Sequence, residues 1–259
     1  MRSSDAEIYY EVHGSGPDVL LVHPFPSHHG IWFPVAEMLS TRYRAILIDV
    51  RGLGESSTGE GPATMDKHAA DILRVLDELK IGKVAYAGNS IGGYIFFEFW
   101  RRYRERVSAV VLADTKASAD ADEARKSRLA AADDVLQRGT EPFIDAQLSK
   151  LMGESTRRNR PDKVTEAKRM MMKASPAGIA SVLRGMAARP DSNATLSTID
   201  VPAMVICGEE DGLTPALEME SMHRSIPKSL FRRVAKAGHY SPFEQPEEVH
   251  RLIRDFLGR

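Results

Sequence analysis

The sequence has few cysteines and little excess charge: its 259 residues include one cysteine and carry a formal net charge of -1. A single cysteine excludes an intramolecular disulfide framework and any metal site that needs several cysteines. Because Cys207 lies in the apolar run 203–207, we expect a buried structural thiol rather than a reactive one. The near-neutral charge, without a basic stripe, argues against a nucleic-acid partner.

Long apolar segments are also missing from the sequence. No stretch approaches the ~20 consecutive apolar residues that cross a bilayer, and residues 1–7 lack the apolar stretch of a signal peptide. We therefore expect a cytoplasmic protein without a membrane partner. Internal repeats and low-complexity tracts are absent as well. The oligomeric state stays open, a homodimer included.

What is present is an alternation of short β-rich runs with helical patterns. Hydrophobic residues make up 42% and charged residues 27% of the chain, which is ordinary for a globular protein. Several runs are almost continuously apolar, as strands buried on both faces are. We predict strands at 8–12, 19–22, 44–49, 83–87, 107–112, 203–207 and 230–234, and helices at 66–79, 91–103 and 247–257. This order predicts an α/β fold, with a mostly parallel central sheet and helices on both faces.

The strand signal stops between about residue 116 and residue 195. This stretch is rich in Ala, Arg, Lys, Glu and Met, and its periodicity and prolines predict helices at 119–137, 142–151, 161–174 and 176–188. Strand signals resume at Val201. We therefore predict a core domain of residues 1–115 and 196–259, with residues 116–195 inserted as a helical cap.

Residues 88–92 read Gly-Asn-Ser-Ile-Gly, between a predicted strand and a predicted helix. Chance supplies such a pattern in roughly one chain of this length in ten, so its meaning depends on its context and partners. A strand, a tight turn and a helix form the context in which this turn holds a strained serine and projects its hydroxyl from the sheet. Glycines on either side avoid collisions at the bend. Ser90 is the predicted nucleophile.

A serine nucleophile needs a base, and a third group that orients the base. Of the eight histidines, His239 lies in the loop between the last predicted strand and the last helix, at the sheet's carboxyl end, where open α/β proteins build their sites. The others have structural explanations as solvated or boundary helix residues (His68, His223, His250), a turn residue (His13), or structural or pocket-lining residues of the loop after the second strand (His23, His28, His29).

For the acid we favour Asp211, in the loop after the strand 203–207, with Asp114 after the strand 107–112 as the reserve. The chain order Ser90, Asp211, His239 is one of the known orders for such a triad. The attack also creates an oxyanion, which needs two N–H donors. We predict the backbone of Ile91 as one donor and that of Phe25 as the other, since the flanking residues Pro24 and Pro26 have no N–H.

Together, the landmarks at 23–26, 49–56, 88–93, 208–215 and 238–239 resemble the α/β-hydrolase superfamily over essentially the whole chain. The similarity is to the branch of 3-oxoadipate enol-lactonase-like hydrolases and small serine carboxylesterases. The family's usual His-Gly is His23-Pro24 here, and the short N-terminus implies an abbreviated or missing first antiparallel strand. We interpret Asp49 and Arg51 as structural residues beneath the site.

The resemblance implies a serine hydrolase that cleaves a carboxylic ester or lactone of a small, largely apolar substrate through an acyl-enzyme, with no cofactor and no metal. C–C bond hydrolysis or perhydrolysis by the same triad is the alternative. A ligand receptor of the same fold, with little turnover, is an alternative of another class. Dehalogenase and epoxide-hydrolase relatives would carry Asp in place of Ser90.

Substrate choice is expected to lie in the cap, whose mixed charge selects no charged substrate. We predict Trp32, Leu213 and Tyr240 as pocket walls, because they flank the catalytic elements. Methionines of the cap could line an adaptable pocket, but such residues are more often packing residues of helices: Met152, Met170, Met171, Met172 and Met186.

Overall fold

The computed structural model describes residues 1–3 and 5–258, and a seven-stranded sheet forms its centre. The strands of this sheet are β3 (Tyr10–His13), β4 (Asp18–Val22), β5 (Arg44–Ile48), β6 (Val84–Asn89), β7 (Val107–Ala113), β8 (Ala203–Gly208) and β9 (Leu230–Val234). Their spatial order is β3-β5-β4-β6-β7-β8-β9. Outside the sheet, β1 (Arg2–Ser3) pairs antiparallel with β2 (Ala6–Glu7).

The edge strand β3 runs antiparallel to β5, whereas the other neighbouring strands of this sheet pair in parallel. The expected first strand is thus present but abbreviated to four residues, and it begins two residues later than predicted. Every residue of β6 and β8 is buried, which explains their continuous apolar sequence. Strand β6 extends to Asn89, so the chain leaves the sheet directly at Ser90.

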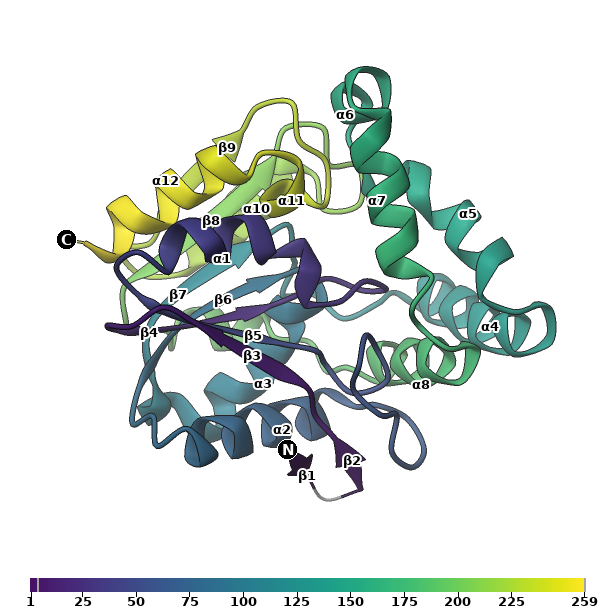
Figure 1. Ribbon diagram of the computed structural model, residues 1–259, viewed down its shortest axis with the longest axis horizontal. Helices are drawn as coiled ribbons and strands as arrows, with labels where there is room; N and C mark the ends of the chain where they lie inside the picture. Colours follow the sequence, from purple (N-terminus) through teal and green to yellow (C-terminus); the bar gives the residue numbers. More distant parts are fainter. Residues whose placement is uncertain (4, 259) are drawn as a thin grey trace.

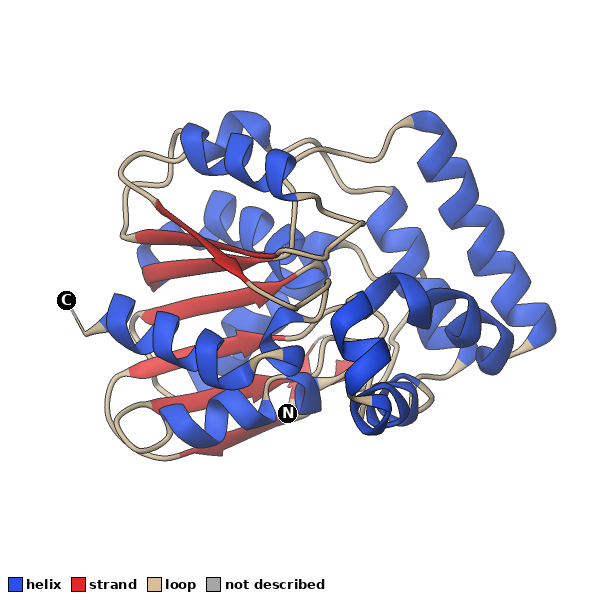
Figure 2. Ribbon diagram, turned by 90° about the horizontal axis from the view of Figure 1, so that it is seen from above, coloured by secondary structure: helices blue, strands red, loops and turns tan. Residues whose placement is uncertain are grey.

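Two layers of helices cover the two faces of the sheet (Figure 1; Figure 2). On one face lie α1 (Phe33–Leu39) and α12 (Pro246–Leu257), and on the other lie α2 (Met65–Glu78), α3 (Ile91–Tyr103) and α10 (Ala216–Ser225). Alternate side chains of β4 enter the two resulting cores: Leu20 and Val22 join one, Val19 and Leu21 the other. The predicted α/β fold is therefore confirmed.

Six helices lie between β7 and β8, in the stretch where the sequence shows no strand signal. They are α4 (Asp122–Arg138), α5 (Thr140–Leu151), α6 (Glu154–Asn159), α7 (Pro161–Met171), α8 (Pro176–Ala187) and α9 (Asn193–Leu196). Helices α4 to α8 gather at one end of the sheet (Figure 1). Four of the six were expected from the sequence with shifted ends; α6 and α9 are new, and both are too short for a clear helical period.

Several other short helices have no counterpart in the sequence-based prediction. These are α1, α10, α11 (Ser241–Glu244), η1 (His29–Ile31) and η2 (Arg104–Arg106). Helices of three turns or fewer owe their stability to packing rather than to their own sequence, so pattern alone does not reveal them. Within the described part of the chain, no helix combines the length and the apolar character needed to cross a membrane.

Candidate active site

Ser90 occupies a sharp turn between β6 and α3 and has backbone angles of φ 55° and ψ -112°. A positive φ is unfavourable for a residue with a side chain, so the surrounding structure must hold it there. The backbone N–H of Ser90 donates to the Ala113 carbonyl at 2.9 Å, and the Thr115 hydroxyl donates to the Ser90 carbonyl at 2.7 Å. These bonds tie the strained residue to the end of β7.

Close backbone approach explains the glycines around Ser90. A Cβ on Gly88 would lie 2.5 Å from the backbone of Gly92, and a Cβ on Gly92 would lie 2.7 Å from the Val22 carbonyl oxygen. A Cβ on Gly93 would lie 2.4 Å from the Thr115 hydroxyl. Any side chain at these positions would push the turn away from the neighbouring strand.

Three residues from different loops form a hydrogen-bonded chain at the carboxyl end of the sheet. His239 Nε2 lies 2.7 Å from Ser90 Oγ, and His239 Nδ1 lies 2.8 Å from Asp211 Oδ2. All three side chains are buried. The structure thus brings together Ser90, Asp211 and His239, which follow β6, β8 and β9 in the sequence.

Asp211 is held as a carboxylate. Burial opposes its charge, but the His239 imidazole and donated hydrogen bonds outweigh that cost and lower the pKa of Asp211 to about 2. The donors besides His239 are the Thr214 hydroxyl, the Thr214 N–H at 3.1 Å and the Leu213 N–H at 2.8 Å. An ionised Asp211 therefore fixes the orientation of the imidazole.

Asp114, the reserve candidate for the acid, does not reach the imidazole of His239 in the structure. Its carboxylate accepts hydrogen bonds from the Ser241 hydroxyl and from the Gly208 N–H at 2.7 Å. Burial, together with the nearby negative charge of Asp211, raises the pKa of Asp114 well above its usual range. Asp114 thus links the segment after β7 to the end of β8 and to Ser241 of α11, while Asp211 contacts the base.

The loop after β4 presents the predicted second oxyanion donor. Among the described residues, the N–H groups of Phe25 and Ile91 have no hydrogen-bond acceptor, and both residues lie beside the serine turn or its cavity. Buried His23 anchors this loop, because its Nδ1 donates to the Pro24 carbonyl at 2.9 Å and its Nε2 accepts from the Val50 N–H at 3.0 Å. The peptide bond between Phe25 and Pro26 is cis.

A cavity of about 340 Å³ opens above Ser90 and His239, between the sheet and helices α4, α5 and α8. Its apolar lining comes from the loop after β4 and from α5 and α8, and its charged lining from α4, α5 and the segment before α4. Its lining includes Lys116, Asp120, Arg128, Lys150, Met186 and Leu213. A larger hollow of about 750 Å³ lies at the amino-terminal edge of the sheet, away from these groups.

Two of the three residues predicted as pocket walls do not line this cavity. Trp32 is fully buried on the α1 face of the sheet, where its Nε1 donates to the Val22 carbonyl at 3.0 Å. Tyr240 is also fully buried, and its hydroxyl donates to the Phe25 carbonyl at 3.2 Å. Tyr240 therefore supports the oxyanion loop from behind. Leu213 does line the cavity and is 40% exposed.

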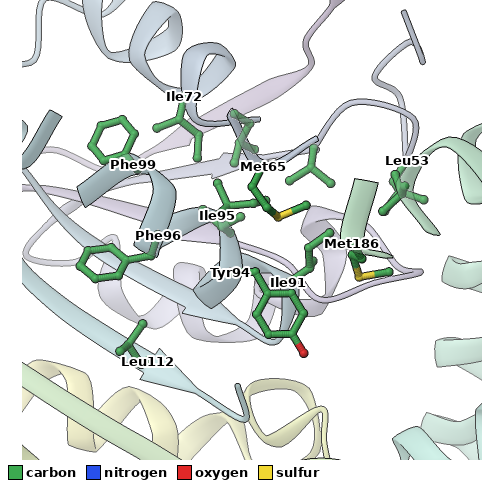
Figure 3. Close-up of a cluster of buried hydrophobic side chains, with 14 of the residues drawn as sticks. Leu53, Met65, Ile72, Ile91, Tyr94, Ile95, Phe96, Phe99, Leu112 and Met186 are labelled. Carbon is green, nitrogen blue, oxygen red and sulfur yellow. The ribbon is translucent and has the colours of Figure 1, made fainter. Parts of the chain in front are cut away.

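Of the methionines in the cap region, Met186 lines the cavity. It also belongs to the buried hydrophobic cluster drawn in Figure 3. Met152, Met170 and Met171 are buried packing residues, and Met172 is an exposed residue outside the cavity lining. The packing interpretation therefore applies to most of them.

The helical region contacts the histidine loop directly. The Leu151 carbonyl accepts from the His239 N–H at 3.1 Å. The buried Glu244 carboxylate accepts from Gly153 at 2.8 Å and from Gly238 at 2.9 Å. Burial raises the pKa of Glu244 against the opposing effect of these hydrogen bonds. The position of His239 thus depends on residues of both regions.

One group of side chains among the described residues has the spacing of metal ligands: His28, His29 and Asp49. Asp49 already accepts from the His29 N–H at 2.7 Å, from His29 Nδ1 at 2.9 Å and from the Glu55 N–H at 2.9 Å. These bonds saturate the carboxylate and hold the turn that follows β5. Arg51 likewise forms a buried ion pair, with Asp71, so both residues have the structural contacts expected of them.

Sequence reasoning missed the charged residues of the cavity wall and the buried Glu244, whose carboxylate holds Gly153 and Gly238. Lys116 lies close behind the end of β7, a position that could have signalled a site residue. Arg128 and Asp120 gave no such signal, because Arg128 is one charge among many on α4 and Asp120 lies in the charged segment just before it. His68 was expected at a solvated or boundary position but is fully buried, and neither ring nitrogen has a hydrogen-bond partner of normal geometry.

Comparison with known proteins agrees with this architecture. A family model described as alpha/beta hydrolase fold matches residues 17–246. The chain therefore belongs to the alpha/beta hydrolase fold family, as its landmarks predict.

Among its relatives, a thermophilic esterase from Thermogutta terrifontis, solved with malate bound, is 39% identical. It covers 97% of this chain and 93% of its own, with a TM-score of 0.95. A Bacillus subtilis protein with the provisional name 2-succinyl-6-hydroxy-2,4-cyclohexadiene-1-carboxylate synthase is 31% identical, over 96% of this chain and 95% of its own. The 3-oxoadipate enol-lactonase 2 of Acinetobacter baylyi is 24% identical over 100% of this chain and 96% of its own.

Proposed function

We propose that this protein is a serine hydrolase that cleaves a small carboxylic ester or lactone through an acyl-enzyme. The observation that carries the proposal is the chain Asp211–His239–Ser90, with contacts of 2.8 Å and 2.7 Å, at the base of a cavity. Relatives named as an esterase and an enol-lactonase support ester or lactone hydrolysis as the reaction.

In the proposed first step, His239 Nε2 takes the proton of Ser90 as Oγ attacks the carbonyl carbon. The free N–H groups of Phe25 and Ile91 would then donate to the oxyanion, since donors aimed at developing charge contribute most in a water-poor site. Asp211 keeps the imidazole in the required tautomer and stabilises its cationic form.

In the proposed second half, His239 gives its proton to the leaving alcohol and then activates a water molecule that attacks the acyl-enzyme. Collapse of the second tetrahedral intermediate releases the acid and restores the Ser90 hydroxyl. Each proton moves between His239, Ser90 and substrate or water, so the proposed cycle needs no other proton donor or acceptor.

We further propose that residues 116–195 act as a cap over a core formed by residues 1–115 and 196–259. The contribution of α4, α5 and α8 to the cavity above Ser90 supports this division. A volume of about 340 Å³ favours a small-molecule substrate. A cytoplasmic location belongs to the same proposal.

The direct test is Ser90→Ala, with hydrolysis of p-nitrophenyl acetate and butyrate as the readout. We expect kcat to fall by a factor of about 10⁵ to 10⁶, because removal of a triad nucleophile typically costs this much. Ser221→Ala, at an exposed position of α10, is the matched control and should retain full activity. Undiminished turnover in Ser90→Ala would refute the assignment.

A second measurement separates the enzyme from a receptor of the same fold. A fluorophosphonate should add once per chain, and peptide mass spectrometry should find the adduct on Ser90 and not on Ser221. Steady multiple turnover of esters supports the hydrolase, whereas one equivalent of released p-nitrophenol without turnover supports a receptor. Faster cleavage of a β-diketone than of any ester would favour C–C bond hydrolysis.

A further inference from the structure

The cavity wall formed by α4, α5 and the segment between β7 and α4 carries an excess of positive charge. Lys116, Arg128 and Lys150 line the cavity as cationic residues, whereas Asp120 is the one acidic residue among the lining side chains of the described chain. Lys150 is exposed and therefore well screened by water. Lys116 and Arg128 are half-buried, so their charges act more strongly on a bound molecule.

Asp120 cannot neutralise this wall, because two guanidinium groups already share its carboxylate. Arg128 Nε donates to Asp120 Oδ2 at 2.8 Å, and Arg189 Nη2 donates to Oδ1 at 2.8 Å. This double pairing outweighs burial and lowers the pKa of Asp120 to about 2. The buried Arg189 lies 4.2 Å from the ring centroid of Tyr94, another cavity residue.

Two cationic groups of the wall, Arg128 Nη1 and the Lys116 ammonium, have no oxygen acceptor among the described residues and can bind a ligand. Arg128 Nη1 meets only the thioether sulfur of Met186, a weak acceptor, at 3.7 Å. In the described part of the chain, the Lys116 ammonium forms no ion pair or hydrogen bond. Glu218 binds the Ser118 hydroxyl at 3.2 Å and does not line the cavity. A ligand carboxylate would supply the acceptor that both cations lack.

We propose that the substrate is an ester or lactone that carries a separate carboxylate, which Lys116 and Arg128 bind while Ser90 attacks the ester carbonyl. This inference rests on the proposed hydrolase function. It changes the expected substrate class: the part of the cavity lined by Tyr94 and Met186 accepts an apolar linker, but the far end of the substrate is anionic. Lys116 and Arg128 are then specificity-determining residues.

The test compares kcat/KM for three methyl esters of equal chain length. Methyl hydrogen adipate is anionic, methyl adipamate is its neutral amide, and methyl 6-aminohexanoate is cationic. The variants are Lys116→Met, Arg128→Met and Arg128→Lys, which retains the charge. Lys126→Met is the matched control, because Lys126 is exposed on α4 and does not line the cavity.

We expect the parent to prefer the anionic ester over the amide by about tenfold or more at low salt, since hydrogen bonds between charged groups contribute this much. The cationic ester should be the poorest. This preference should shrink in about 0.5 M salt because the charges are screened. Lys116→Met and Arg128→Met should each lower the ratio at least about threefold with the amide nearly unaffected, while Arg128→Lys and Lys126→Met retain it.

A parent that shows no preference for the anionic ester overturns the inference. An anionic preference that survives in both Lys116→Met and Arg128→Met, even if both esters are cleaved more slowly, also overturns it. Cleavage of the neutral ester by the parent but not by Ser90→Ala supports the hydrolase function whatever the ratio. If none of the three esters is cleaved above the Ser90→Ala rate, the inference fails, while Ser90-dependent turnover of p-nitrophenyl butyrate still decides the hydrolase function.

Discussion

The two sides of the cavity are built in different ways. On the floor, the predicted triad and the oxyanion loop follow the carboxyl ends of β4, β6, β8 and β9, and backbone contacts hold them. On the wall, helices α4, α5 and α8 contribute side chains that are partly open to water. The path of the backbone thus places the proposed catalytic groups, whereas the proposed selectivity rests on half-buried side chains outside the strands of the sheet.

The two sides meet at the His239 loop. The Leu151 carbonyl accepts from the His239 N–H, and the Gly153 and Gly238 N–H groups share the Glu244 carboxylate. The Glu210 carboxylate also accepts from the Ser155 N–H at 2.7 Å. The wall is therefore hydrogen-bonded to the floor next to the proposed base. A substitution on either side can shift the position of His239.

The largest effect expected on the floor comes from Asp211→Asn. The amide cannot hold the imidazole tautomer, so kcat for p-nitrophenyl butyrate should fall by about 10⁴ with little change in melting temperature. Asp114→Asn is the matched control, one strand away, and should lower kcat by less than about tenfold because Asp114 does not contact the imidazole. Equal losses in the two variants would contradict the assignment of Asp211.

The next largest effect is expected when a side chain is added at Gly88, in the tight turn before Ser90. Gly88→Ala places a Cβ 2.5 Å from the backbone of Gly92, so we expect a loss of about 2–3 kcal/mol in the free energy of unfolding, together with lower activity. Gly82→Ala has nothing within 4 Å of the added Cβ and should change stability by less than about 0.5 kcal/mol. Urea denaturation measures both, and a stable, active Gly88→Ala would show that the turn can shift.

A pH experiment tests the ion pairs of the wall. The pKa of Asp120 is lowered to about 2 in the folded protein, below its unfolded value of about 3.9. Its contribution to stability is therefore complete above about pH 4 and is lost as the pH falls through 2. At neutral pH, Asp120→Asn should cost about 2 kcal/mol or more.

The loss of unfolding free energy in Asp120→Asn should become smaller as the pH approaches 2. Urea unfolding at pH 7, 4 and 2.5 measures this change. Asp122→Asn, at an exposed position of the first turn of α4, is the control without a buried ion pair. If Asp120→Asn lowers the free energy of unfolding by the same amount at every pH, the ionised state of Asp120 is contradicted.

The smallest expected effect lies at the mouth of the cavity. Leu213→Ala removes a 40% exposed side chain that lines the cavity, so KM for p-nitrophenyl butyrate should rise about twofold to fivefold with kcat unchanged within about twofold. Leu217→Ala, at a position 79% exposed and outside the cavity lining, should leave both constants unchanged. A large fall in kcat for Leu213→Ala would mean that this side chain also affects the geometry of the proposed triad.

Most of the sheet and the positions of the proposed triad could be predicted from local sequence. Apolar runs identified all seven strands of the main sheet, and α3 has the predicted bounds, Ile91–Tyr103. The direction of loop side chains could not be predicted. Trp32 and Tyr240 flank elements of the site in the sequence. Trp32 nevertheless points into the core, and the Tyr240 hydroxyl points toward the Phe25 carbonyl.

Local apolar periods and the glycines of one turn are enough to predict the alternation of strands and helices and the positions of Ser90, Asp211 and His239 after strands. The contact between Asp211 and His239, the methionine that lines the cavity and the sharing of Asp120 by Arg128 and Arg189 are visible only in the folded chain. Hydrogen bonds and ion pairs depend on distances of a few ångströms between segments far apart in the chain, which no local pattern records.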